Sequence, residues 1–409
     1  MKSTSFPKQK INILLLENIS NSALEEFEKA GYATIKRMSG ALEEDELIKQ
    51  IKDVHLVGIR SKTQITRKVL EKAPKLLAVG CFCIGTNQVD KKAATELGIA
   101  VFNAPYSNTR SVAELVIGLM IMLIRKVPDK NKSAHEGIWL KDAKGCYEMR
   151  GKTLGIIGYG NIGSQVSVLA EAFGMKVVFY DVERKLPVGN AHPVAKLNEL
   201  LKQADIVTLH VPSDKGTRNM INATTLAQMK KSSILINYSR GDVVDLQALK
   251  KYLDKGHLSG AAIDVFPEEP EKNGASFSTC LQGTSNVMLT PHIGGSTEEA
   301  QFNIGIDVAE KMIQYLETGS SYGSHTVPEI SLRLLENTHR ILHIHKNIPG
   351  VLGEINTKLS SKNINISGQY LKTNEQIGYV VLDVDSKVSK DALSLLKEVK
   401  GTIKARVLF

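Results

Sequence analysis

A glycine-rich turn constrains this chain more than any other feature of its sequence. The apolar run 154–157 leads into Gly158-Tyr159-Gly160-Asn161-Ile162-Gly163, after which a helical pattern begins. Gly158 permits a tight turn, Gly160 lets a pyrophosphate approach the backbone, and Gly163 lets the helix pack closely on the strand. Unpaired amides at a helix N-terminus favour an anion there. The turn therefore predicts a dinucleotide-binding sheet.

An acidic residue sharpens this prediction. Asp181 ends the next apolar run, where a carboxylate can bond the ribose hydroxyls and repel a 2′-phosphate. We therefore expect NAD rather than NADP as the cofactor. The alternative is a glycine-rich turn in an α/β domain that holds no ligand.

The order of apolar runs predicts two α/β series and a third, different unit. Runs 11–16, 54–59, 76–82 and 99–102 alternate with amphipathic stretches, and six further runs follow Gly151. Such alternation favours parallel sheets covered on both faces. After a helical pattern at 298–316 and a Gly/Ser-rich stretch that is typical of a linker, the tail shows a βαββαβ order of ferredoxin-like type. The fold class is α/β, with two Rossmann-like doubly wound domains.

These patterns also predict the domain boundaries. We expect a substrate-binding domain at 1–106 with 297–323, an NAD-binding domain at 107–296, a linker at 324–338, and a regulatory domain at 339–409. A nearly all-apolar helix over 112–124 is expected to be buried, partly in a dimer contact.

Composition excludes several classes of protein. Lys and Arg total 52 and Asp and Glu total 43. This excess of +9 is spread along the chain, favours anionic small molecules about as well as nucleic acid, and identifies neither. No nucleic-acid or membrane partner is predicted. The longest apolar run is too short to cross a bilayer. The four cysteines are too few for a disulfide framework and fit a cytoplasmic protein. Cys81 and Cys83 are expected to be packed thiols, and no metal site is predicted.

Polar residues follow three later apolar runs, where the predicted strands end. They lie in Asn237-Tyr238-Ser239-Arg240-Gly241, in Asp264 with Glu268 and Glu269, and in Pro291-His292-Ile293-Gly294-Gly295. Ligands bind beyond the carboxyl ends of open parallel sheets. Oxidation of a secondary alcohol needs a base, a carboxylate beside the resulting imidazolium and a cation for the substrate acid. His292, Glu269 and Arg240 meet these needs.

Each of these three residues also has a plainer interpretation. A histidine after proline is often a hydrogen-bonded turn residue, Arg240 could pair with Asp242, and Glu269 could be a solvated loop residue. Their joint occurrence after the glycine-rich turn favours catalysis.

Four segments carry a resemblance to a known family. They are G-Y-G-N-I-G (158–163), S-R-G-D-V-V-D (239–245), A-A-I-D-V-F-P-E-E-P (261–270) and L-T-P-H-I-G-G-S-T (289–297). Together they resemble the D-isomer-specific 2-hydroxyacid dehydrogenase family. Segments 82–90 and 102–118, and the C-terminal tail, resemble its members that oxidise D-3-phosphoglycerate. The resemblance implies NAD-dependent oxidation to 3-phosphohydroxypyruvate, the step that leads toward L-serine, with 2-oxoglutarate reduction as a second activity.

The resemblance also implies roles for individual residues. Arg240 would bind the substrate carboxylate and carbonyl, Glu269 would support the histidine, and His292 would act as acid and base. The cofactor would be bound by Gly158, Gly160, Asn161, Ile162, Gly163, Asp181, Tyr238, Ser239, Asp264, Gly294 and Gly295. The substrate would be bound by Arg60, Ser61, Lys62 and Asn108, and by Lys141 reaching into a neighbouring subunit. Lys62 stands where these relatives usually carry arginine, which keeps the charge but loses the bidentate geometry. Without the resemblance, segment 60–62 is an ordinary solvated strand end.

The tail resembles an ACT domain, a regulatory module that binds amino acids. Alternation along 340–345 places His343 and His345 on one face. The resemblance implies that His345, Asn347 and Asn365 bind L-serine between paired modules of a homotetramer. The alternative is a module that only assembles subunits. Residues 324–349 contain no glycine, so Asn337-Thr338 predicts a stiff joint and weaker inhibition than in relatives with a Gly-Gly pair.

Two other functions remain open from the sequence. One is a different D-2-hydroxyacid dehydrogenase, acting on lactate, glycerate or 2-hydroxyglutarate. The other is a binding protein that senses NAD without catalysis, which the complete set Arg240, Glu269 and His292 disfavours.

Overall fold

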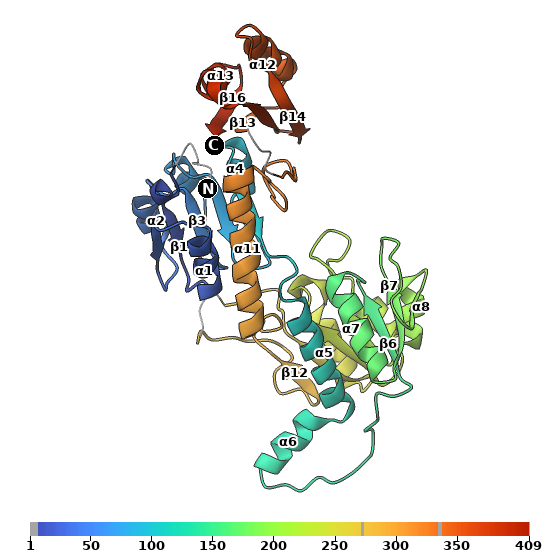
Figure 1. Ribbon diagram of the computed structural model, residues 1–409. Coiled ribbons are helices and arrows are strands. Elements are labelled where there is room, and N and C mark those ends of the chain that lie inside the picture. Colours follow the sequence, from blue (N-terminus) through green and yellow to red (C-terminus); the bar gives the residue numbers. More distant parts are fainter. Residues whose placement is uncertain (1–6, 271–273, 334–337, 409) are drawn as a thin grey trace. The chain divides into compact units, whose positions relative to one another are not determined.

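The computed structural model describes residues 7–270, 274–333 and 338–408, which form two compact units (Figure 1). One unit combines the residues up to 107 with those from 298 onward, and the other comprises residues 108–297. The joint expected at Asn337 falls in 334–337, outside the described residues.

The first unit is built on a five-stranded parallel sheet in the order β2-β1-β3-β4-β5. Its elements are a 3-10 turn η1 (Lys8–Lys10), β1 (Ile13–Leu15), α1 (Asn21–Lys29), β2 (Ile35–Arg37), α2 (Glu44–Ile51), β3 (Leu56–Ile59), α3 (Arg67–Glu71), β4 (Ala78–Cys81), α4 (Lys91–Glu96), β5 (Ala100–Asn103) and, from much later in the chain, α11 (Glu298–Thr318). Alternate strand residues face two cores. Ile13 and Leu15 pack toward α1 and α11, and Leu14 packs toward α2, α3 and α4. Both faces are therefore covered, as expected for a parallel sheet.

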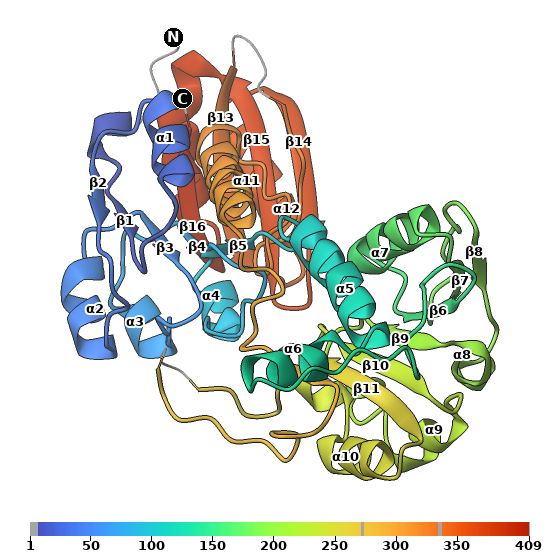
Figure 2. The same ribbon diagram turned by 90° about the horizontal axis from the view of Figure 1, so that it is seen from below.

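The second unit contains a seven-stranded parallel sheet in the order β12-β11-β10-β9-β6-β7-β8. Its elements are α5 (Thr109–Ile124), α6 (Val127–His135), β6 (Thr153–Ile157), α7 (Asn161–Ala172), β7 (Lys176–Tyr180), β8 (Ala191–Pro193), α8 (Leu197–Gln203), β9 (Ile206–Leu209), α9 (Ala223–Gln228), β10 (Ser233–Asn237), η2 (Gly241–Val243), α10 (Leu246–Asp254), β11 (Leu258–Ile263) and β12 (Val287–Leu289). Helices α5 and α7 cover one face, and α8, α9 and α10 cover the other (Figure 2). The strand order reverses between β6 and β9, which is the usual place for a dinucleotide.

The C-terminal module, residues 338–408, is a four-stranded antiparallel sheet in the order β14-β15-β13-β16. Its elements are β13 (Thr338–Lys346), α12 (Val351–Ser360), β14 (Ile366–Thr373), β15 (Ile377–Asp385), η3 (Ser386–Val388), α13 (Ser389–Lys397) and β16 (Thr402–Val407). One face packs on α12 and α13. The other carries Leu342, Ile344 and Tyr379 into the core that contains α11. The predicted βαββαβ order is confirmed.

The sequence-based prediction missed two strands, β2 and β8. Both are three residues long and lie at the edges of their sheets. Most of their residues are exposed, and β8 ends in Pro193, so neither shows the continuous apolar run of a buried strand.

The Gly/Ser-rich stretch after α11 is packed along much of its length rather than forming a free spacer. Thr326 is buried, and its hydroxyl donates to the Ile99 carbonyl and accepts from the Val101 amide. The Ser321 hydroxyl donates to the Pro328 carbonyl at 2.6 Å. The two bonds of Thr326 attach the stretch to β5 and to the residue before that strand, and the bond of Ser321 closes the stretch on itself.

Candidate active site

The glycine-rich turn has the geometry that a dinucleotide requires. Gly158 has a φ of 90°, and a Cβ there would lie 2.5 Å from the His210 carbonyl oxygen. A Cβ at Gly163 would lie 2.2 Å from the Gly158 carbonyl oxygen, whereas the space beside Gly160 is open. Helix α7 begins at Asn161, directly after this opening, and Ile162 follows in its first turn. Its unpaired amides can therefore receive a phosphate.

Asp181 follows β7 and is held by backbone amides. Its carboxylate accepts from Tyr159 N at 2.8 Å and from Glu183 N at 2.9 Å. Each oxygen retains one further acceptor position, so the carboxylate can still receive ribose hydroxyls. The residues fit NAD.

His292 and Glu269 form a direct pair in the loops after β12 and β11. The distance between His292 Nδ1 and Glu269 Oε2 is 2.7 Å, and Glu269 Oε1 accepts from Phe266 N at 3.0 Å. This second bond fixes the carboxylate. The pairing directs Nε2, the other ring nitrogen of His292, away from Glu269, where it can exchange a proton with a substrate.

Electrostatics within this pair favour a charged ring. The hydrogen bond that His292 donates to the Glu269 carboxylate raises the pKa of His292 despite partial burial. Burial alone would raise the pKa of Glu269, but the bonds from His292 and from the Phe266 amide outweigh burial, so its pKa is lowered. The carboxylate thus stays ionised and stabilises an imidazolium.

Asp264 holds the loop that carries His292. Its buried carboxylate accepts from Ile293 N and Gly294 N, both at 2.8 Å, and from the Thr290 hydroxyl at 2.6 Å. His292 itself has a φ of 54°, a left-handed conformation that few residues other than glycine adopt. The bonds to Asp264 offset this strain, so the position of His292 depends on Asp264.

Two polar residues extend this support. The Tyr238 hydroxyl pairs with Thr290 Oγ1 at 2.6 Å. The sequence predicted Tyr238 and Asp264 as cofactor residues and missed Thr290, which resembles an ordinary strand end. Ser239 is buried, and its hydroxyl donates to Asn237 Oδ1.

Arg240 lies in the loop after β10 and is exposed. Its Nη1 donates to the Ser239 carbonyl at 2.7 Å, whereas Asp242 bonds Ser213 and lies 3.6 Å from Arg218. The plainer interpretation, a pair between Arg240 and Asp242, therefore receives no support. A Cβ on the next residue, Gly241, would lie 2.1 Å from the Phe266 backbone, so the absence of a side chain lets the loop of Arg240 approach that of Glu269.

The loop of Arg60, Ser61 and Lys62 follows β3 in the first unit. One buried carboxylate, Glu17, accepts from Arg60 N at 3.1 Å, Lys62 N at 3.0 Å and Thr63 N at 2.8 Å. Glu17 thus holds this loop in position, a role that was not predicted from the sequence. Because Glu17 follows the first strand, the rule applied to later strand ends would have identified it.

The two remaining predicted substrate residues belong to the second unit. Asn108 is the N-cap residue of α5, and its amide packs against Gly295, where a Cβ would lie 2.2 Å from Asn108 Nδ2. Gly294 lies between Asp264 and Tyr238. Lys141 is exposed in the segment after α6, beside Trp139, whose side chain is 85% exposed.

Of the predicted effector residues, His345 and Asn347 lie at one end of the C-terminal sheet, whereas Asn365 directly precedes β14, whose first residue pairs with Val384 at the opposite end. His343 and His345 stack with their ring centres 5.3 Å apart, and both are buried. His345 Nδ1 has no hydrogen-bond partner within the described residues. Asn347 donates to the Asn374 carbonyl at 2.8 Å, and Asn365 is exposed.

Two absences hold for the part of the chain that the structure describes. None of its groups of His, Cys, Asp or Glu could hold a metal ion. None of its helices is long and apolar enough to span a membrane.

Two family models match the chain. The D-isomer specific 2-hydroxyacid dehydrogenase, NAD binding domain, matches residues 117–294, and the AHAS small subunit-like ACT domain matches residues 341–404. The first contains the glycine-rich turn and the pair His292–Glu269, and the second covers most of the C-terminal module.

The chain is also similar to known proteins over its whole length. It is 53% identical to a D-3-phosphoglycerate dehydrogenase of Haemophilus influenzae over 99% of both chains, and 52% identical to that of Escherichia coli K12 over all of both. The structure of an Aquifex aeolicus D-lactate dehydrogenase with NAD and lactic acid matches with a TM-score of 0.63 and 28% identity. The match covers 75% of this chain and 95% of that one. The predicted α/β fold, NAD cofactor and dehydrogenase activity are confirmed, and the chain belongs to the D-isomer-specific 2-hydroxyacid dehydrogenase family.

Proposed function

We propose that the chain oxidises D-3-phosphoglycerate to 3-phosphohydroxypyruvate with NAD, the step that leads toward L-serine. The pair of His292 with Glu269, 2.7 Å apart, carries the chemical part of this proposal. Two full-length relatives with this activity in their names, 53% and 52% identical, support the choice of substrate. The sparse cysteines, none of them paired in a disulfide, fit a cytoplasmic enzyme.

The catalytic roles follow from the geometry of the loops. His292 Nε2 takes the proton of the C2 hydroxyl, and Glu269 stabilises the imidazolium that forms. When bound on the glycine-rich turn, NAD would supply the acceptor for the hydride that leaves C2. Arg240 holds the substrate carboxylate and polarises the C2 oxygen as it becomes a carbonyl. In the reverse direction His292 would return the proton while the reduced cofactor would be the source of the hydride, and the same residues would reduce 2-oxoglutarate as a second activity.

We assign the substrate phosphate to the loop of residues 60–62, which Glu17 holds in position. Arg60 and Lys62 supply two cations there and Ser61 a hydroxyl, while Asn108 and a neighbouring subunit's Lys141 complete the set. This assignment assumes that residues 1–106 with 297–323 form the substrate-binding domain and 107–296 the NAD-binding domain, with 324–338 as the link to the regulatory domain at 339–409.

Substrate choice is tested by NADH formation with D-3-phosphoglycerate, D-glycerate, D-lactate and D-2-hydroxyglutarate. We expect the highest kcat/KM with D-3-phosphoglycerate. Arg60→Gln should raise its KM about tenfold or more while changing D-glycerate little, because only the phosphorylated acid uses the cation. A preference for an unphosphorylated acid would assign the chain to another activity of the family.

We propose further that L-serine regulates the enzyme through the C-terminal module in a homotetramer. The buried Nδ1 of His345, which has no hydrogen-bond partner among the described residues, supports this proposal, because such a group is satisfied by a ligand or a second subunit. His345, Asn347 and Asn365 are the proposed serine ligands. His345→Ala should raise the serine concentration for half-inhibition by about tenfold or more. If serine leaves the wild-type enzyme fully active, the proposal is wrong and the module serves only to assemble subunits.

A further inference from the structure

A cavity of about 770 Å³ lies within the first unit, beside β16 of the C-terminal module. Its lining includes Asn12, His55 and Leu77, the residues that directly precede β1, β3 and β4. The cavity therefore lies at the amino ends of these strands. Arg60 follows the carboxyl end of β3. The cavity and the proposed phosphate loop therefore lie at opposite ends of the strands of one sheet.

The lining carries an excess of positive charge. Its cations are Lys10, Lys75, Lys397, Lys404 and Arg406, and no aspartate or glutamate is among the residues that line it. Lys75 is paired, with the exposed Asp53. In the described parts of the chain, the other four cations form no ion pair with a carboxylate. Like charges gathered around a hollow without counter-charge attract anions.

The two innermost cations hold neutral partners. Lys404 Nζ donates to the Leu76 carbonyl at 2.6 Å, and Arg406 Nη2 donates to the Tyr315 carbonyl at 2.8 Å. The guanidinium of Arg406 also lies over the Tyr315 ring, 4.9 Å from its centre. Both side chains have more donors than these bonds use. They are fixed in place and can still bind a ligand.

Lys404 is held at an electrostatic cost. Burial, and after it the positive charge of Arg406, lowers the pKa of Lys404 to about 8. An anion beside the ammonium group would remove this cost.

We propose that this cavity is a second ligand site, which binds a small anion with two or more phosphate or carboxylate groups. The ligand bridges two parts of the unit, because Lys10 and Lys75 come from the N-terminal segment, and Lys397, Lys404 and Arg406 come from the C-terminal module. Binding therefore strengthens the attachment of the module to the five-stranded sheet and links the supply of a charged metabolite to regulation.

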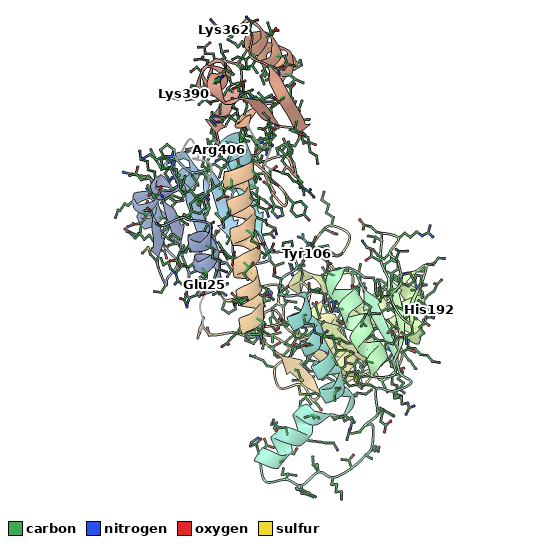
Figure 3. The ribbon with its side chains drawn as sticks, in the orientation of Figure 1. Glu25, Tyr106, His192, Lys362, Lys390 and Arg406 are labelled. Carbon is green, nitrogen blue, oxygen red and sulfur yellow. The ribbon has the colours of Figure 1, made fainter. Side chains whose placement is uncertain are left out.

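The first test uses inorganic pyrophosphate and calorimetric titration of the full-length chain. Arg60→Gln with Lys62→Gln serves as the parent, so that the proposed substrate loop does not contribute binding. Lys10→Glu with Lys397→Glu reverses two exposed charges at the cavity and should weaken binding about tenfold or more. The matched control, Lys362→Glu with Lys390→Glu, makes the same charge change elsewhere on the C-terminal module, at positions away from Arg406 (Figure 3). It should alter binding less than about twofold.

The outcomes are distinct. No binding of pyrophosphate to the parent, or equal weakening by the cavity pair and the control pair, would overturn the proposal. If the parent binds and only the cavity pair weakens binding, the site is supported. Repeating the titration with citrate and with inorganic phosphate tells whether carboxylates serve as well as phosphates, and whether one anionic group suffices.

A second measurement does not depend on the charge reversals. Citrate stays fully ionised near pH 8, where Lys404 is half protonated, so its binding should draw in about half a proton per chain. The groups around Lys404 are Lys10, His55, Lys75 with Asp53, Tyr315, Lys397 and Arg406. Titration in two buffers of different ionisation enthalpy measures the uptake. Lys404→Gln should abolish it, and equal uptake in that variant would contradict the proposed site.

Discussion

Two histidine arrangements in this chain share a residue type and differ in charge. His292 is half-exposed and bonded to the Glu269 carboxylate, which raises its pKa. His343 is buried, stacked on His345 and bonded to the Thr402 hydroxyl, and burial lowers its pKa to about 4. The first ring is able to carry a proton through a reaction cycle. The second stays neutral and can only offer a fixed donor or acceptor.

The pKa values of His292 and His343 differ because of the groups around each ring, not because of the strands that carry them. Both histidines follow or belong to apolar β-runs, yet only His292 has a carboxylate partner supplied by a separate loop. A neutral, buried pair is suited to recognise a zwitterion or a second subunit, whereas a charged pair is suited to proton transfer. Changing one member of each arrangement tests this division of roles.

The largest effect is expected for His292→Ala. Loss of the general base should lower kcat by about 10³–10⁴-fold, while NAD still binds, because the glycine-rich turn is untouched. Steady-state assays and a separate cofactor titration measure the two properties. His192→Ala, at an exposed position on the edge strand β8 (Figure 3), is the matched control and should retain wild-type kcat. Comparable losses in both variants would contradict the assignment.

Glu269→Gln should have the next largest effect. The amide keeps the shape but removes the charge that raises the pKa of His292, so kcat should fall about 10²-fold. Oxidation needs a neutral His292, because only the neutral ring can take the hydroxyl proton. The rate of oxidation therefore rises as the pH passes through the pKa of His292. In the variant this rise should move to lower pH, toward the ordinary value of histidine. A pH profile of kcat/KM for oxidation measures the shift, and an unmoved profile would argue that another group is titrated.

His343→Gln tests the neutral arrangement. The unfolded chain binds a proton at this histidine below about pH 6.5, whereas the folded chain does so only near pH 4. The free energy of unfolding should therefore fall by about 2–3 kcal/mol as pH drops between these values. Denaturant unfolding at several pH values should show a shallower acid dependence in the variant. An identical slope in both proteins would mean that His343 is already protonated in the fold.

The sequence predicted the sheets, the C-terminal module and the positions of His292, Glu269 and Arg240. Those features are encoded locally, by apolar runs and by the residues at their ends. It missed β2 and β8, because short exposed edge strands carry little pattern. It also missed two polar residues of the site. Glu17 follows the first strand and could have been found by the rule applied to later strand ends, whereas the partners of Thr290 lie at other strand ends and become visible only when the strands are assembled.

The smallest effect is expected for Thr290→Val, which removes one hydroxyl beneath the His292 loop. Asp264 keeps its two bonds from backbone amides but loses the bond from Thr290, and the Tyr238 hydroxyl loses its partner. We expect a fall in kcat of about threefold to tenfold and a loss of about 1 kcal/mol in stability. Thr208→Val is the matched control, because Thr208 is buried in strand β9 of the same sheet and bonds His210 at 3.0 Å. If Thr208→Val lowers kcat as much as Thr290→Val, the effect reflects general weakening of the sheet. A fall confined to Thr290→Val would show that the network of Tyr238, Thr290 and Asp264 positions the catalytic histidine.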